Sequence, residues 1–171
     1  MHSSTDYDDQ PDTKPIIYSG PSLNFTRDTW WDALLYLYSI PDHEASATPI
    51  QMNSGLRDIA VKRITSDLYF LLRHAPYWFS FINAPRFLQR LNATNRRDLQ
   101  PSLILTALAI ATFLQSSENE QGERGRQKAL RLQDQAQGAL DASLNGGWID
   151  EDLVRASWVS CTVPHRRRNR H

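Results

Sequence analysis

An apolar stretch near the middle of the chain constrains the fold more than any other feature. Between residues 103 and 114, ten of the twelve side chains are apolar, and Pro101 stands shortly before them. A run of this length is too short to span a bilayer and is typical of a helix buried in a protein core. Such a helix is apolar on all sides, so other elements must cover it all round. We therefore predict a central helix over residues 101–116.

Segments on both sides of this stretch have the periodicity needed to cover it. Their apolar residues recur every three or four positions, which is the spacing of a helix with one buried face. Proline or glycine separates consecutive segments, for example at Pro41, Pro76 and Gly146. The helices predicted in this way cover residues 30–38, 56–75, 86–91, 123–145 and 151–159.

Several residues are suited to begin or end these helices. Thr29 with Asp32 has the form of a capping box, and Asp150 is a good N-cap for the last helix. Gly146 and Gly147 tolerate the positive φ that often closes a helix. In the last helix, the residues expected to face the core are Leu153, Val154, Ser157 and Trp158.

These patterns predict an all-α fold, a helical bundle of about five to six helices that is incomplete at its C-terminal end. Residues 1–28 contain three prolines and little periodic apolar content, so we expect a disordered lead-in. Residues 29–159 form the helical domain. Residues 160–171 lack periodicity and are predicted to be a basic, disordered tail.

The charge of the chain is balanced, with 19 Lys and Arg residues against 19 Asp and Glu residues. A dedicated nucleic-acid-binding domain usually has a basic face, so zero net charge argues against that class. Four arginines nevertheless lie close together in the tail. They could be a nuclear localisation signal, a nonspecific phosphate contact or a solvated tail, and we favour the last. These residues are Arg166, Arg167, Arg168 and Arg170.

Cys161 is the only cysteine, and we place it in the tail. A single cysteine excludes an intramolecular disulfide and a multi-cysteine zinc cluster within this chain. The first twelve residues are rich in Ser and Asp and have no apolar run, so they do not form a secretory signal. We expect no association with a membrane.

The sequence has none of the common catalytic patterns. It lacks a glycine-rich phosphate loop, a dinucleotide-binding fingerprint and a nucleophile elbow. The five histidines are dispersed, and we expect His74 to act as a favourable charge at a helix C-terminus. The acidic pair Asp150 and Asp152 stands at a helix start, where capping is the expected role. We predict no enzymatic activity and no catalytic, cofactor-binding or metal-binding residues.

An aromatic segment follows Pro76. Five of the seven residues at 77–83 are aromatic or Ile, without a clean helical or strand period. The segment could be an irregular plug between helices, which we favour, or part of a pocket for a small-molecule effector. The candidate pocket residues are Tyr77, Trp78, Phe79, Phe81 and Phe87.

Four segments carry a resemblance to a known family: TWWDALL at 29–35, YWFSFINAPRFL at 77–88, QPSLILTALA at 100–109 and GWID at 147–150. In this order they resemble the middle regulatory region of fungal transcription factors with a six-cysteine binuclear zinc cluster, in the form found in basidiomycetes. This region is also called the fungal-specific or xylanolytic-activator regulatory domain. The resemblance covers roughly residues 29–159, and its motifs are hydrophobic and structural.

The resemblance implies an all-α domain that regulates transcription in the nucleus, although the cytoplasm is also consistent with the sequence. It implies protein partners, either the transcription machinery or a second copy of the chain. The cysteines of the family's zinc cluster are absent here, which implies no cofactor and no direct sequence-specific DNA binding. Because the family's region continues past a helix at 153–159, we expect a truncated form. A small-molecule-sensing helical domain and a non-functional truncated fragment are the alternatives.

Overall fold

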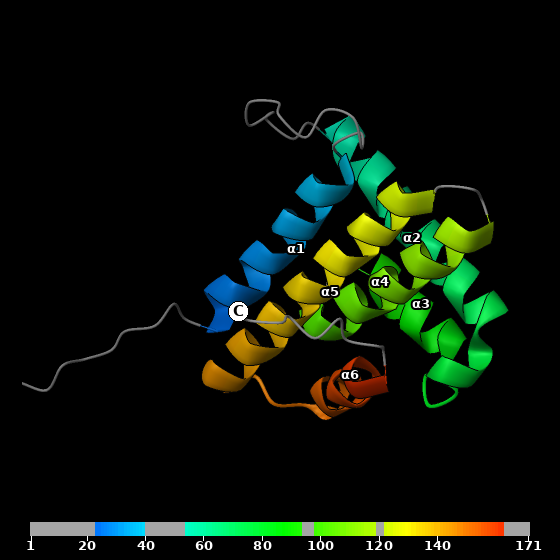
Figure 1. Cartoon of the computed structure of the whole chain (residues 1–171). Coiled ribbons are helices and arrows are strands. Elements are labelled where there is room, and N and C mark those ends of the chain that lie inside the picture. The colour runs from blue at the N-terminus through cyan, green and yellow to red at the C-terminus, as the bar shows by residue number, and fades with distance from the viewer. Residues whose placement is uncertain (1–22, 40–53, 94–97, 119–121, 163–171) are drawn as a thin grey trace, which may run out of the picture.

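The computed structural model describes residues 23–39, 54–93, 98–118 and 122–162. In these ranges the chain forms six α-helices and one short 3-10 helix, and no strand (Figure 1). The predicted all-α fold is confirmed. The helices are α1 (Leu23–Ser39), α2 (Ser54–His74), the 3-10 helix η1 (Pro76–Phe79), α3 (Ala84–Asn92), α4 (Pro101–Glu118), α5 (Gly122–Asn145) and α6 (Glu151–Thr162).

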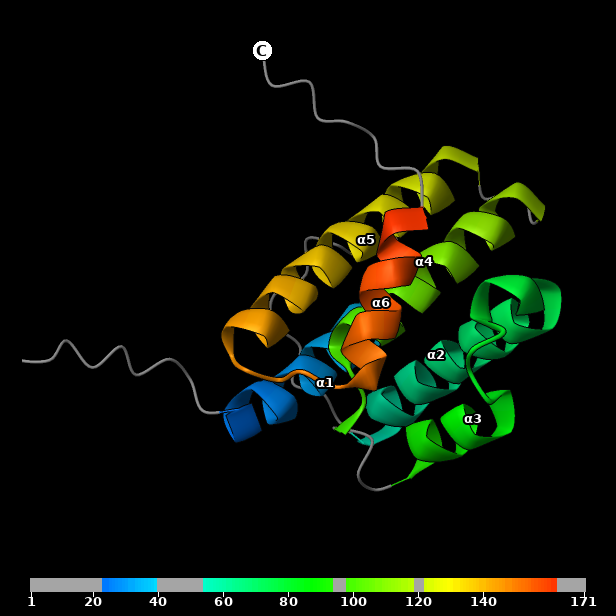
Figure 2. The same ribbon diagram turned by 90° about the horizontal axis from the view of Figure 1, so that it is seen from below.

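Helix α4 lies at the centre of the bundle, as its composition predicts. It packs against α2, α5 and α6, and every residue from Pro101 to Ala109 is buried. Figure 1 shows α5 running alongside α4, and Figure 2 shows α6 lying across α4 on another side. Helix α1 joins the bundle by packing against α2. No helix in the described ranges is both long enough and apolar enough to cross a membrane.

The start of α1 differs from the prediction. The helix begins at Leu23, so Thr29 lies inside it and the predicted capping box is wrong. The hydroxyl of Thr29 donates a 2.8 Å hydrogen bond to the carbonyl oxygen of Phe25, which lets a threonine remain within a helix. Residues 23–28 of the expected lead-in are therefore helical. The remainder of that segment, residues 1–22, lies outside the described residues.

The last helix also extends further than predicted. Its N-cap is Asp150, whose Oδ1 accepts a 2.9 Å hydrogen bond from the amide of Leu153, which confirms the predicted cap. The helix continues to Thr162, so Ser160 and Cys161 are helical and not part of a tail. The four arginines of the candidate nuclear localisation signal, at 166–168 and 170, lie outside the described residues.

The buried face of α6 is rotated relative to the prediction. Leu153 is buried as expected, but Val154 and Trp158 are exposed. Small residues allow α6 to approach α4 closely, and the hydroxyls of Thr106 and Ser160 are hydrogen-bonded at 3.2 Å. The prediction turned the larger residues of this helix toward the core. It was wrong about Val154 and Trp158 because the close contact between α6 and α4 favours small side chains. The buried residues of α6 after Asp152 are Leu153, Ala156, Val159 and Ser160.

Trp148 fixes the connection between α5 and α6. Its side chain is buried, and Gly147 before it has a φ of +73°, as predicted for this helix end. The carbonyl oxygen of Trp148 accepts a 2.9 Å hydrogen bond from Nε2 of Gln100. Its indole Nε1 donates to Asp150 at 3.1 Å, and the guanidinium of Arg27 lies 4.6 Å from the ring centroid. These contacts determine where α6 begins.

Candidate functional site

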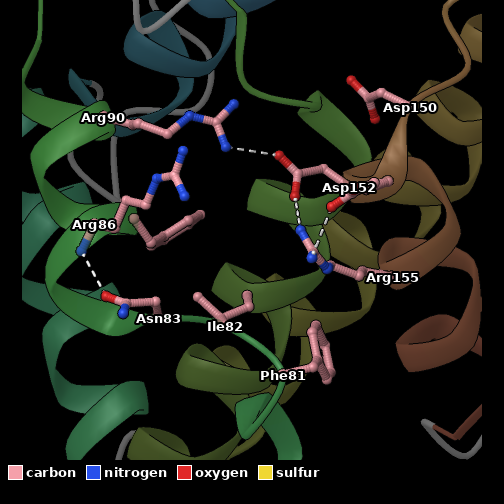
Figure 3. Close-up of a pocket in the computed structure, with 10 residues that line it drawn as sticks. Phe81, Ile82, Asn83, Arg86, Arg90, Asp150, Asp152 and Arg155 are labelled. Atoms are coloured by element: carbon pink, nitrogen blue, oxygen red, sulfur yellow. Dashed lines mark hydrogen bonds and ion pairs between the residues drawn. The ribbon is translucent and has the colours of Figure 1, made fainter.

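A groove open to solvent separates α3 from the start of α6 (Figure 3). Its volume is about 350 Å³. Phe81, Ile82 and Phe87 supply its apolar surface, and Asn83 lies at its edge. The remaining lining residues are six charged side chains, three of each sign, contributed by α3, by α6 and by its N-cap. The groove therefore combines an apolar surface with two charged walls.

The α3 wall carries Arg86 and Arg90, which are four residues apart and so lie on one face of the helix. Asn83 caps this helix, because its Oδ1 accepts a 3.0 Å hydrogen bond from the amide of Arg86. Phe87 and Leu91 are buried and hold α3 against the core. Figure 3 shows both arginines extending from α3 toward α6.

The α6 wall carries three carboxylates, each of which has a donor. Asp150 accepts hydrogen bonds from the amide of Leu153 and the indole of Trp148. The carboxylate of Asp152 is nearly enclosed and bonds to Arg90 at 3.0 Å and to Arg155 at 2.8 Å. Arg155 also pairs with Glu151 at 3.0 Å. Asp152 thus joins α3 to α6 through a shared ion pair.

Arg86 differs from the other charged residues of the groove. Its side chain is exposed, and its guanidinium makes no hydrogen bond or ion pair with any residue in the described ranges. Arg90 and Arg155 both share the carboxylate of Asp152. The α3 wall therefore keeps one positive charge that has no partner within the described part of the chain.

The five aromatic residues of the predicted pocket do not form one pocket. Phe81 and Phe87 line the groove, whereas Phe79 is buried in the core and Tyr77 is 86% exposed. The side chain of Trp78 lies outside the described residues. The segment begins with a 3-10 helix, and Phe79 fills part of the core as the plug interpretation expects.

An exposed apolar face lies beside the groove on α6. Val154 is 63% exposed and Trp158 is 56% exposed, and Cys161 on the next turn is also exposed. The ring of Trp158 contacts Phe81 edge-on, with 5.8 Å between the ring centroids. Because Phe81 lines the groove, the exposed face of α6 and the groove are adjacent. We call the surface formed by Val154, Trp158 and Cys161 the α6 face.

A second polar cluster lies where α1, α2, α4 and α5 meet. Asp67 on α2 accepts a 3.1 Å hydrogen bond from Nε2 of Gln115 on α4. Burial raises the pKa of the Asp67 carboxyl, although the side chains of Gln115, Lys128 and Tyr38 act in the opposite direction. The ammonium of Lys128 lies 5.4 Å from the ring centroid of Tyr38. This cluster connects four helices and is not part of the groove.

The groove is suited to binding by ion pairing and apolar contact. Its described lining includes no His, Cys, Ser or Thr. The carboxylates that line it belong to residue types that can act as acids, bases or nucleophiles, and here Asp150, Glu151 and Asp152 are each hydrogen-bonded or ion-paired within the chain. His74 lies at the end of α2, where its ring stacks on Phe70 and Nδ1 lies 2.9 Å from the Phe70 carbonyl oxygen. Within the described ranges, no group of three or more His, Cys, Asp or Glu residues could hold a metal ion.

Sequence reasoning missed the charged walls of the groove. Arg86 and Arg90 follow an Asn-Ala-Pro helix start at helical spacing, so their shared face could have been recognised. Their proximity to Asp152 could not, because Arg90 and Asp152 are 62 positions apart in the chain. The two walls come together because α6 packs against α4 and α5, while α3 packs against α2.

Comparisons with known proteins identify no relative. No protein family model, no curated protein and no solved structure matches this chain. The resemblance to the regulatory region of fungal zinc-cluster transcription factors therefore stays a prediction that rests on the four segments quoted above.

Proposed function

We propose that this chain is a non-enzymatic regulatory and protein-interaction domain, like the middle region of fungal zinc-cluster transcription factors, and that it acts in the nucleus. The chain contacts proteins and does not read DNA sequence by itself. The α6 face is the observation that carries this proposal. The all-α bundle is compatible with the proposed family and does not by itself distinguish it from other helical folds.

The α6 face has the properties of a protein contact. Val154 and Trp158 are large apolar residues one turn apart, and both are mostly exposed. Tryptophan is enriched among the residues that contribute most to binding at protein interfaces. Adjacent exposed apolar side chains lose unfavourable contact with water when a partner covers them. A protein component of the transcription machinery is the partner we propose.

A fusion experiment tests this function. The chain is joined to an unrelated DNA-binding domain in a fungal cell that carries a matching reporter gene. We expect the fusion to change reporter expression relative to the DNA-binding domain alone, and a variant that unfolds the bundle to abolish the change. Unchanged expression, with the fusion present in the nucleus at comparable abundance, would contradict the proposed function.

A binding measurement tests the statement about DNA. The isolated chain is titrated with promoter and random duplexes at about physiological ionic strength, because phosphate contacts depend strongly on salt. We expect weak binding with no preference between the two duplexes. Tight binding to one sequence would contradict the proposal.

Small-molecule sensing is a second candidate function, and the groove between α3 and α6 favours it. Ligand sites are concave, largely apolar and equipped with a few polar groups that orient the ligand. The groove is concave and has an apolar part formed by Phe81, Ile82 and Phe87, although six of its ten lining residues are charged. A ligand that binds only the folded chain must raise its melting temperature, so a thermal screen of metabolites tests this candidate.

A further inference from the structure

We propose that the groove between α3 and α6 binds a small molecule with one negative charge and an apolar body, namely an aromatic or branched aliphatic carboxylate. The carboxylate pairs with Arg86 and approaches the free edge of Arg90, while the apolar body lies on Phe81, Ile82 and Phe87. This proposal rests on the second candidate function, small-molecule sensing, and names the class of ligand.

The charge of the ligand follows from the pairing within the groove. All three carboxylates there already have donors, and Arg90 and Arg155 share Asp152. Arg86 alone among the charged lining residues has no partner in the described ranges. A planar guanidinium can donate two parallel hydrogen bonds to one carboxylate. A ligand carboxylate would therefore pair with Arg86, whereas a ligand cation would have to compete with the donors that the three acids already have.

The opposite wall limits the ligand to one charge. Asp150, Glu151 and Asp152 all line the groove on the α6 side. Because Arg90 and Arg155 are already engaged by Asp152 and Glu151, a second negative charge on the ligand would find no further unpaired cation and would face Asp150. A carboxylate monoanion suits this arrangement better than the dianion of a phosphate monoester.

The lining and volume of the groove limit the rest of the ligand. Phe81, Ile82 and Phe87 offer apolar contact, and the volume of about 350 Å³ is near the small end of the range for ligand sites. A single ring or a short branched chain fills such a space. Trp158 packs edge-on against Phe81, with 5.8 Å between the ring centroids, and so supports the Phe81 ring that the ligand would contact.

A titration followed by NMR tests the proposal, with the methyl groups of Ile82 as the reporter of groove occupancy. Phenylacetate is the probe, and phenylacetamide is the matched neutral compound with the same ring. Phenyl phosphate tests the limit on charge. Arg86→Gln removes the unpaired cation, and Arg131→Gln is the matched variant, because Arg131 is an exposed arginine on α5 outside the groove. Circular dichroism checks that both variants melt as the parent chain does.

We expect phenylacetate to shift the Ile82 methyl signals and to bind roughly tenfold more weakly to Arg86→Gln, the size expected for losing one charged hydrogen-bonding group. Arg131→Gln should bind phenylacetate as the parent chain does. Phenylacetamide should bind the parent chain more weakly than phenylacetate, and phenyl phosphate should bind it no more tightly than phenylacetate. The absence of Ile82 shifts, equal binding by Arg86→Gln, or equal binding of the amide would overturn the proposal. Tighter binding of phenyl phosphate would also overturn it, because the ligand would then not be limited to one charge.

The comparison of carboxylate with amide uses the parent chain alone, so it decides the question even if the variants unfold. Failure of this proposal is distinguishable from failure of the protein-interaction function. The titration contains no protein partner, and the reporter experiment contains no added ligand.

Discussion

Polar groups are accommodated differently at the centre of the bundle and at the edge formed by α3 and α6. Around α4, apolar side chains exclude water, and the buried Gln100 is hydrogen-bonded to Trp148 and Ser143. At the edge, charged residues stay close to water, one arginine lacks a described partner, and the α6 face exposes a tryptophan. The centre is organised for stability, whereas the edge exposes charged and apolar side chains that a partner or ligand can contact.

Two carboxylates illustrate this difference. Asp67, where four helices meet, accepts a 3.1 Å hydrogen bond from the neutral amide of Gln115, and burial raises its pKa. Asp152, at the edge, has two arginines within 3.0 Å. Both acids connect helices, but only Asp152 lies in the groove. Substitutions in the two regions should therefore change the free energy of unfolding by different amounts, and only some of these changes should depend on pH.

The largest effect is expected at the centre. Leu108 on α4 is fully buried, and Leu108→Asp would place a charge there without a partner. We expect the free energy of unfolding to fall by about 4 kcal/mol or more. A loss of this size is a large part of the total stability of a typical domain. Urea unfolding followed by circular dichroism measures it. A stability close to that of the parent chain would show that α4 is not the centre of the bundle.

A smaller effect is expected at the joint between α3 and α6. Asp152→Ala removes the acid shared by Arg90 and Arg155, and we expect a loss of about 1–2 kcal/mol, because both arginines are partly exposed and water can solvate them. Glu151→Ala is the control, since the exposed Glu151 also pairs with Arg155 but should contribute almost nothing. Equal losses for the two variants would contradict the special role of Asp152.

A pH-dependent effect is expected at Asp67. Its pKa in the folded chain is raised above the reference value of 3.8, so the folded state binds the proton more tightly than the unfolded state does. The stabilising contribution of protonated Asp67 is complete below pH 3.8 and is lost as the pH rises through the raised pKa. Relative to Asp67→Asn, the parent chain should become less stable over that interval.

Urea unfolding at a series of pH values measures this difference. Asp141→Asn is a suitable control, because Asp141 is an exposed acid on α5. We expect the stability difference between Asp67→Asn and the parent chain to vary with pH, with Asp141→Asn showing what the removal of an exposed acid does by itself. A constant difference for Asp67→Asn would show that burial does not perturb this acid.

The helical periodicity of the sequence was sufficient to predict the all-α fold, the central position of α4 and the cap at Asp150. These features depend on local patterns, and local patterns are visible in a single sequence. The start of α1 was not predicted, because Thr29 looks like a helix start but bonds to a carbonyl within the helix. The exposed side of α6 was also missed, because close packing on α4 selects Ala156 and Ser160 in place of larger neighbours.

The candidate site was predicted only in part. The aromatic segment supplies Phe81 to the groove, but Phe79 lies in the core and Tyr77 is exposed. The ion pair of Arg90 with Asp152 joins distant parts of the chain, and no local pattern reports such a contact. A site that depends on two helices meeting becomes visible only when their packing is known.

The smallest effect on stability is expected at the α6 face, and this makes the face the best test of function. Val154→Ser combined with Trp158→Ser removes its large apolar side chains while leaving the buried residues of α6 intact. Tyr69→Ser is the matched control, because Tyr69 on α2 is 56% exposed, the same fraction as Trp158. We expect all these variants to remain folded, with losses of about 1 kcal/mol or less.

The reporter fusion carrying these variants shows whether the chain acts through contacts of the α6 face. We expect the change in reporter expression to disappear with the double α6 variant and to persist with Tyr69→Ser, at equal protein abundance. A reporter response retained by the double α6 variant, or lost equally with Tyr69→Ser, would contradict it.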